Sequence, residues 1–121
     1  MSQILIVDDE PDTVDMIKSI LEMYGFSVNT AHNGKECLKK VNKNNTELVL
    51  LDIMMPDMSG WEVFNKIRKT KKNLKVIFIS VVEISPERKQ SLIKDGLFDY
   101  INKPFTKDDL VGRVKNAIET V

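Results

Sequence analysis

The sequence predicts an α/β protein built on a doubly wound parallel sheet of five strands. Two observations lead to this prediction: short apolar runs alternate with longer segments of helical periodicity, and the connections between them are short. Strands buried on both faces read as continuous apolar runs, and strand–helix–strand units join parallel strands by right-handed crossovers. Because the alternation is unbroken, we expect one domain over residues 1–121, with helices on both faces of the sheet.

The apolar run at residues 48–51 is the most clearly defined strand. It is too short for a helix, it is bounded by turn-forming residues, and it ends at Asp52. A carboxylate is costly to bury, so we expect Asp52 where the strand leaves the sheet. The run at residues 4–7 ends in the same way, at Asp8 and Asp9. Both strands therefore end in carboxylates.

The other elements are recognised by weaker apolar runs, by caps and by periodicity. The remaining strands are expected at residues 26–30, 76–79 and 98–101, and helices are expected to begin near Pro11, Asn33, Gly60, Pro86 and Thr106. Residues 26–30 alternate apolar and polar side chains, as an edge strand does. Asn33 and Thr106 each stand three positions before an acidic residue, which resembles a capping box. The helix over residues 87–94 has few apolar residues, which predicts a mobile element or a partner-binding face.

Composition excludes several classes of protein. Basic and acidic residues number 18 each, so no overall field draws the chain to nucleic acid or to a membrane surface. The single Cys37 cannot form an internal disulfide, and no apolar run could span a bilayer. We interpret the basic run at residues 68–72 as a solvated helix end, and His32 as a surface histidine. The expectation is a cytoplasmic protein without direct nucleic-acid contact or membrane insertion.

Polar side chains follow four of the expected strands. Besides Asp8, Asp9 and Asp52, Ser80 ends the fourth strand and Lys103 follows the fifth. In such sheets ligands bind outside the carboxyl ends of the strands, near the switch in strand order. With the order 2-1-3-4-5, strands one, three and four are adjacent. The carboxylates and the hydroxyl would then face one crevice, and Lys103 would reach in from the side.

These segments resemble the receiver domain of two-component response regulators, from end to end of the chain. The resemblance rests on Val-Asp-Asp-Glu-Pro at 7–11, Leu-Asp-Ile-Met-Met-Pro-Asp-Met-Ser-Gly at 51–60, Ile-Ser at 79–80, and Gly96 through Tyr100 to Lys-Pro-Phe at 103–105. It implies the flavodoxin-like (βα)5 receiver fold, in a single-domain form similar to that of chemotaxis regulators.

The resemblance also implies a role for each residue of the crevice. Asp52 would accept a phosphoryl group, and the other roles fall into three sets: Mg²⁺ ligands Asp8, Asp9, Asp52 and the backbone carbonyl of Met54; phosphoryl-binding Ser80 and Lys103; and the switch residues Ser80 and Tyr100. Physical chemistry favours the cation independently. Two carboxylates about 4 Å apart repel by about 4 kcal/mol at an effective dielectric near 20. Mg²⁺ is a hard ion that prefers oxygen ligands, so it suits such a crevice.

The partners implied by the resemblance lie upstream and downstream of Asp52. A sensor histidine kinase or a phosphotransfer protein would supply the phosphoryl group, and a downstream protein or output domain would bind the altered surface of the fourth helix, fifth strand and fifth helix. The resemblance also allows a homodimer that forms on phosphorylation. The chain would be no enzyme in the usual sense, since it would catalyse only its own phosphorylation and dephosphorylation.

Three other functions are alternatives at this point. A receiver-like protein-interaction module working without phosphorylation would typically lack one of the site residues, and all are present here. A metal-dependent phosphohydrolase should show a further acid or base near Asp52 and a covering cap. A flavin mononucleotide module would need a glycine- and hydroxyl-rich loop after the first strand, where this chain has Asp-Asp-Glu.

Three positions depart from the usual pattern of the family. Val81 stands where a very small residue is usual, and Met54 and Val82 stand where many members carry polar side chains. Apolar side chains cannot orient a water molecule, so we expect slow loss of the phosphoryl group. Met54, Met55 and Met58 are interpreted as packing residues, with only the carbonyl of Met54 in the site.

Overall fold

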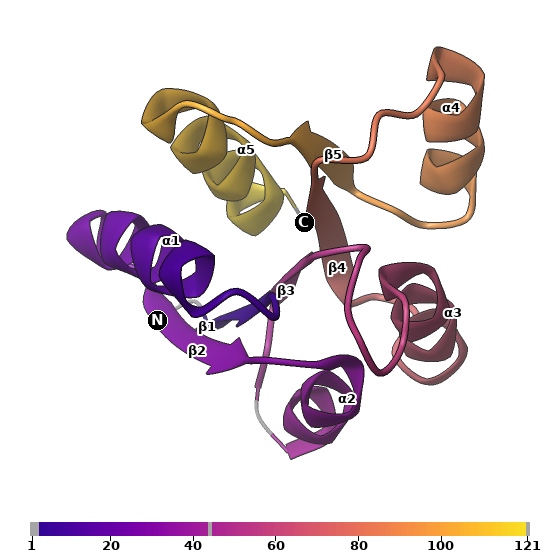
Figure 1. Ribbon diagram of the computed structural model, residues 1–121, viewed down its shortest axis with the longest axis horizontal. Coiled ribbons are helices and arrows are strands. Elements are labelled where there is room, and N and C mark those ends of the chain that lie inside the picture. The colour runs from indigo at the N-terminus through magenta and orange to yellow at the C-terminus, as the bar shows by residue number, and fades with distance from the viewer. Residues whose placement is uncertain (1–2, 44, 121) are drawn as a thin grey trace.

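The computed structural model describes residues 3–43 and 45–120, and it has the predicted architecture (Figure 1). Five parallel strands form one sheet in the order β2-β1-β3-β4-β5. The strands are β1 (Gln3–Val7), β2 (Ser27–Ala31), β3 (Leu48–Leu51), β4 (Lys75–Ser80) and β5 (Asp99–Asn102). The helices are α1 (Pro11–Met23), α2 (Gly34–Lys43), α3 (Gly60–Thr70), α4 (Pro86–Lys94) and α5 (Lys107–Glu119). The predicted fold class and strand order are therefore confirmed.

Helices cover both faces of the sheet, and the sheet separates two apolar clusters. Helices α1 and α5 pack on one face, while α2, α3 and α4 pack on the other (Figure 1). Along β1, Ile4 and Ile6 belong to the apolar cluster under α1 and α5, whereas Leu5 and Val7 belong to the cluster under α2, α3 and α4. Successive side chains of a strand point to opposite faces, so a strand covered on both sides must be apolar throughout.

The ends of the elements follow the sequence signals closely. Gly25, with φ of 86°, terminates α1 in the left-handed conformation that favours glycine. The side chain of Asn33 accepts a hydrogen bond from the amide of Glu36 at 2.8 Å, and that of Thr106 accepts one from the amide of Asp109 at 3.0 Å. The predicted caps of α2 and α5 thus form. Strands β2 and β5 begin one residue later than the sequence predicted.

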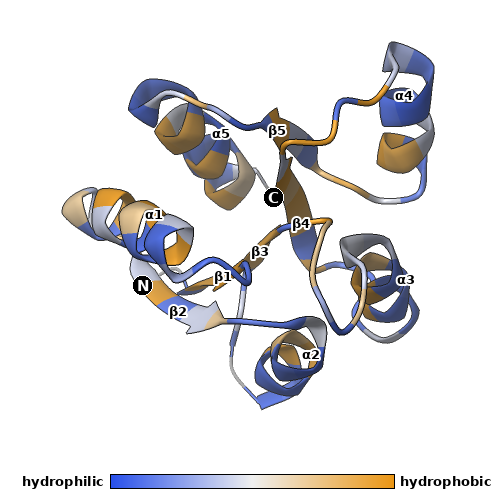
Figure 2. Cartoon of the chain, viewed as in Figure 1, coloured by the Kyte–Doolittle hydropathy of each residue, from blue (hydrophilic) through white to orange (hydrophobic). Residues whose placement is uncertain are grey.

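Of the five helices that cover the sheet, α4 buries the fewest side chains. Among its described residues only Leu92 is buried, whereas Ile93 is 46% exposed. Helix α5 by contrast buries Leu110, Val111, Val114 and Ala117. Figure 2 shows α4 as mostly hydrophilic, with one apolar patch facing the sheet. The prediction of a thinly packed fourth helix is confirmed.

Candidate functional site

Three carboxylates meet at the carboxyl ends of β1 and β3. In the parallel pairing Val7 lies opposite Leu51, so the residues that follow them, Asp8 and Asp52, leave the sheet side by side. Oxygen atoms of Asp8, Asp9 and Asp52 all lie within 4.8 Å of one another. Asp8 and Asp52 are buried and Asp9 is exposed. The crevice predicted at this edge of the sheet is therefore present.

Backbone hydrogen bonds fix the two buried carboxylates. The amide of Asp52 donates to the carbonyl of Val7 at 2.9 Å, which extends the β1–β3 pairing by one residue. The carboxylate of Asp8 accepts from the amide of Glu10 at 3.0 Å, and that of Asp52 accepts from the amide of Met54 at 3.4 Å. The second of these contacts is long, so the Asp52 oxygens stay largely available to a ligand.

The structure brings Lys103 into the same crevice. Its ammonium nitrogen lies 2.8 Å from Oδ2 of Asp8, and both side chains are mostly buried. The amide of Lys103 donates to the carbonyl of Ser80 at 2.8 Å, which anchors the segment after β5 to the end of β4. In this structure Lys103 thus compensates one of the carboxylates rather than approaching Asp52 directly.

The crevice disfavours the negative charge of Asp52. Burial, together with the neighbouring carboxylate of Asp8, raises the pKa of Asp52 to about 6, and the ammonium of Lys103 opposes this rise. Three carboxylates and one ammonium leave an excess of negative charge in a crevice of oxygen donors. That chemistry fits Mg²⁺, a hard cation that prefers oxygen ligands and keeps waters in its remaining coordination positions.

Ser80 and Tyr100 lie next to the crevice and meet at Val82. The Ser80 hydroxyl is fully buried and accepts a hydrogen bond from the amide of Val82 at 3.1 Å. The Tyr100 hydroxyl donates to the carbonyl of Val82, and its ring is 3% exposed. Burial raises the pKa of Tyr100. Tyr100 therefore occupies an inward position here, and Val82 links the side chains of Ser80 and Tyr100 to the segment that leads into α4.

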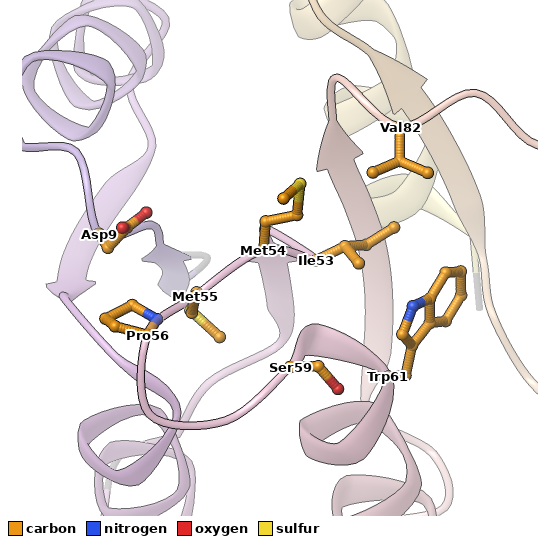
Figure 3. Close-up of a pocket in the computed structure, with 8 residues that line it drawn as sticks. All are labelled: Asp9, Ile53, Met54, Met55, Pro56, Ser59, Trp61 and Val82. Carbon is orange, nitrogen blue, oxygen red and sulfur yellow. The ribbon is translucent and has the colours of Figure 1, made fainter.

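An apolar cleft of about 520 Å³ opens beside the carboxylates (Figure 3). It is lined by Asp9, Ile53, Met54, Met55, Pro56, Ser59, Trp61 and Val82. In Figure 3 Asp9 lies on one side of the loop that carries Met54, and Trp61 and Val82 lie on the other. Met54 and Val82 thus line the cleft together with Asp9, whereas Val81 is 64% exposed and is not among the lining residues.

The interpretation of Met54 as a packing residue is wrong. Met54 is 61% exposed because its side chain lines the open cleft, whereas its neighbour Ile53 belongs to the larger apolar cluster and is 4% exposed. Met55 and Met58 are partly buried against the larger apolar cluster, so they do pack as predicted. His32 is exposed, in agreement with its interpretation as a surface residue.

Two residues contribute to the site although they were assigned no role in it from the sequence. The amide of Gly60 donates to the carbonyl of Ile53 at 2.7 Å, and a Cβ at position 60 would lie 2.4 Å from the carbonyl oxygen of Asp52. Only glycine fits there. Trp61 follows it, and its ring packs edge-on against Phe78 with centroids 5.0 Å apart. The sequence does show a glycine soon after Asp52, within the motif at residues 51–60, and this could have indicated a close backbone approach. The contact of Trp61 with Phe78 depends on the fold and could not be predicted from the sequence.

Comparisons with known proteins agree with this geometry. The family model described as the response regulator receiver domain matches residues 4–115. A receiver domain protein of Methanospirillum hungatei, described as CheY-like, is 34% identical with a TM-score of 0.89, over 98% of this chain and 94% of that one. The response regulator TrrA of Thermotoga maritima, solved in complex with Mg²⁺ and BeF, is 39% identical with a TM-score of 0.85, over 97% of this chain and 99% of that one.

The chain belongs to the response regulator receiver domain family. It is the receiver domain of a two-component response regulator. Among curated relatives, the CpxR homologue of Haemophilus influenzae, a transcriptional regulatory protein, is 38% identical over 95% of this chain and 49% of its own length. The chain spans about half the length of the curated relatives it matches. No helix in the described part of the chain combines the length and apolar content needed to cross a membrane.

Proposed function

We propose that Asp52 accepts a phosphoryl group from a phosphohistidine, in a reaction that depends on Mg²⁺. The observation that carries this proposal is the cluster of three carboxylates with oxygen atoms within 4.8 Å, beside the ammonium of Lys103. A carboxylate oxygen of Asp52 forms the new bond to phosphorus while the phosphorus–nitrogen bond breaks, and the electron pair of that bond remains on the donor imidazole. With its pKa at about 6, Asp52 is mostly ionised at neutral pH and available as a nucleophile.

The residues around Asp52 have separate proposed roles in binding the metal ion and the phosphoryl group. Asp8, Asp9, Asp52 and the carbonyl of Met54 are the proposed ligands of Mg²⁺, which when bound would offset charge on the carboxylates and on phosphoryl oxygens. Lys103 would exchange its ion pair with Asp8 for one with the phosphoryl group. Phosphoryl transfer depends mainly on positioning and charge stabilisation, so these groups suffice for the chemistry.

We further propose that the signal is read through Val82. If the Ser80 hydroxyl turns toward the phosphoryl group, it gives up its bond to the amide of Val82, and the segment leading into α4 loses one of its anchors. The side chains of Tyr100 and Asn102, which both donate to the carbonyl of Val82, supply the others. Helix α4 has a single buried side chain, and weakly packed elements are those that small energies can move.

The proposed partners follow from this surface. A sensor histidine kinase or a phosphotransfer protein would act as donor in the cytoplasm, and a downstream protein, an output domain or a second copy of the chain would bind the surface of α4, β5 and α5. That surface is charged, with Arg113 of α5 2.8 Å and Lys89 of α4 3.8 Å from Asp99 of β5. Membership in the receiver family disfavours the phosphohydrolase and flavin alternatives. The rival that experiment must separate is a receiver-like module working without phosphorylation.

The test is incubation with acetyl phosphate and Mg²⁺, followed by intact-mass measurement. The wild-type chain should gain one phosphoryl group, and omission of Mg²⁺ should prevent the gain. Asp52→Asn should abolish labelling, whereas Asp95→Asn, which changes an exposed carboxylate after α4, should leave it intact. Labelling that survives in Asp52→Asn would refute the assignment. A wild-type chain that stays unlabelled with both acetyl phosphate and a phosphohistidine donor would favour the phosphorylation-independent module.

A further inference from the structure

The loop between β3 and α3 carries a proposed Mg²⁺ ligand on backbone that has no regular structure. The carbonyl of Met54 can serve the ion only if this loop keeps one conformation. Within the loop, the amide of Gly60 closes onto the carbonyl of Ile53, and Ser59 accepts from the amide of Glu62 at 3.3 Å. These bonds hold the end of the loop to its own strand and its own helix. They leave its outer part without a support from elsewhere in the fold.

Asp57 supplies that support. Its Oδ1 accepts from the amide of Gly34 at 3.0 Å, and its Oδ2 accepts from the amide of Lys35 at 3.1 Å. Among the hydrogen bonds of the described residues 53–59, these are the ones that connect the loop to a distant part of the chain. The two amides also lower the pKa of Asp57, since they favour its ionised form. The carboxylate therefore bridges the loop and the start of α2 with both oxygens engaged.

The start of α2 is shared between two side chains. The amides of Gly34 and Lys35 go to Asp57, and the amide of Glu36 goes to Asn33. The first amides of a helix have no partner within the helix, so side chains that accept from them stabilise its first turn. Asn33 accepts its hydrogen bond from within the segment that begins α2, whereas Asp57 accepts from the amides of α2 while belonging to the loop between β3 and α3. The two residues cap one helix, but only Asp57 also restrains the loop.

Close packing supports the same link. A Cβ at Gly34 would lie 2.9 Å from Cγ2 of Val63 and 3.0 Å from Cβ of Met58. Such distances are shorter than van der Waals contact, so the absence of a side chain at Gly34 lets the first turn of α2 rest directly on the loop. Met58 is itself partly buried against the apolar cluster. The loop is thus clamped between its apolar contacts and the start of α2.

We propose that Asp57 is a positioning residue for the metal site, acting through the loop that carries Met54. By fixing the loop to the first turn of α2, it holds the backbone of Met54 in the place from which the carbonyl serves the ion. This inference rests on the proposed Mg²⁺ binding. Residues that orient metal ligands typically change metal affinity by 10- to 100-fold when mutated. Asp57 is exposed, so we expect an effect near the lower limit, about tenfold.

The link also couples α2 to the metal site in both directions. If the first turn of α2 favours the binding conformation of the loop, then Mg²⁺ must stabilise that first turn by the same factor. Bound Mg²⁺ should therefore slow hydrogen exchange at the amides of Gly34 and Lys35 in the wild-type chain. The slowing should disappear in Asp57→Ala, in which the connection is missing.

The experiment compares Asp57→Ala with Asn33→Ala in Mg²⁺ titrations of the full chain followed by amide NMR spectra. Both variants remove a cap from α2, but only the first releases the loop. Asp57→Ala should raise the Kd for Mg²⁺ about tenfold and shift the amides of Met54 and Met55 even without metal. Asn33→Ala should leave the Kd within twofold. Asp57→Asn keeps the size and one acceptor oxygen, so it should give an intermediate Kd, and it serves if Asp57→Ala does not fold.

Two results would overturn the inference. An unchanged Kd in both Asp57 variants would show that the loop needs no such restraint. Equal weakening in Asn33→Ala and Asp57→Ala would show that stability of α2, and not the bridge, matters. Both results require a wild-type chain that binds Mg²⁺. A wild-type chain that binds none would instead refute the proposed function, and with it this role of Asp57.

Discussion

Asp52 stands between two very different surroundings. On one side the end of β1 and the segment after β5 bring charged groups to it: Asp8, Asp9 and Lys103. On the other side lies the apolar cleft, whose side chains include Met54, Trp61 and Val82. The first region is organised by ion pairing and strand register, and the second by the loop after β3 and the segment after β4 (Figure 3).

This contrast separates two properties of a phosphoryl acceptor. Forming the proposed acyl phosphate requires compensation of charge, which the polar side would provide through the proposed cation-binding carboxylates and through Lys103. Hydrolysing it requires a water molecule held in line with the phosphorus–oxygen bond, and an apolar surface offers that water no hydrogen bond. We therefore expect changes on the polar side to alter metal binding and phosphorylation. Changes on the apolar side should alter the lifetime of the phosphorylated state.

The largest effect is expected from Asp9→Ala on the polar side. Loss of one carboxylate from the site should weaken Mg²⁺ binding by about 10²- to 10³-fold. One pair of unit charges about 4 Å apart is worth about 4 kcal/mol at an effective dielectric near 20, which corresponds to about 10³-fold, and the exposure of Asp9 to solvent reduces this. The measurement is a Mg²⁺ titration at fixed ionic strength. Asp15→Ala removes the same charge from the exposed face of α1, and it should have little effect. An equal loss in Asp15→Ala would mean that overall charge, rather than coordination, governs binding.

The next effect concerns the apolar side. Replacing Met54 with Asn and Val82 with Glu should accelerate loss of the phosphoryl group by about 10²-fold, the lower end of what groups that position water or transfer protons contribute. The decay of labelled protein after removal of donor gives the rate. Val81→Ala should change it little, because Val81 is not among the residues that line the cleft. Unchanged decay in the double variant would show that orientation of water does not limit this protein.

A smaller effect, in stability, is expected from Asp52→Asn without metal. Because burial and Asp8 raise the pKa of Asp52 from 3.8 to about 6, its ionised form costs the folded state free energy above pH 6. Without screening, this shift in pKa corresponds to a loss of roughly 3 kcal/mol in the free energy of unfolding. Screening by solvent reduces this loss, so we expect the unfolding free energy of Asp52→Asn to exceed that of the wild-type chain by about 1–2 kcal/mol at pH 7.

The pH dependence of that gain provides its control. The folded chain binds the proton more tightly than the unfolded chain, so the cost shrinks as pH falls from about 6 toward 3.8 and is absent below, where both states are protonated. Urea unfolding of both chains across this range, in the presence of a chelator, measures it. A variant that is equally stable at pH 7, or a gain that grows as pH falls, would contradict the environment described for Asp52.

The smallest effect is expected from Tyr100→Phe, which tests the connection between the two sides. The variant loses the hydroxyl that donates to Val82, whereas Asn102 still donates to the same carbonyl at 3.3 Å. The expected cost is about 0.5–1 kcal/mol of unfolding free energy. Hydrogen exchange should rise in residues 82–94 more than in α5, and Mg²⁺ affinity should stay constant. A change in Mg²⁺ affinity instead would show that Tyr100 belongs to the polar side.

The sequence by itself determined the sheet, the helices and the edge at which the site lies. Apolar runs, caps and periodicity are local signals, so they predicted β1 and β3, the cap of α2 by Asn33, and the thin face of α4. The carboxylates of Asp8, Asp9 and Asp52 could be placed together because residues that follow neighbouring parallel strands emerge at one edge. In the structure, the parallel pairing of Val7 with Leu51 brings Asp8 and Asp52 to the same edge of the sheet.

Tertiary structure decided how those residues use their positions. Lys103 pairs with Asp8 across 95 residues, and Asp57 reaches the start of α2 across 22 and 23 residues. Met54 was expected to pack, but it lies exposed at the cleft, while the adjacent Ile53 is buried. Such contacts depend on where loops turn in three dimensions, and neither local propensity nor periodicity specifies that. Sequence reasoning therefore located the chemistry, and the folded chain set the two surroundings in which it would take place.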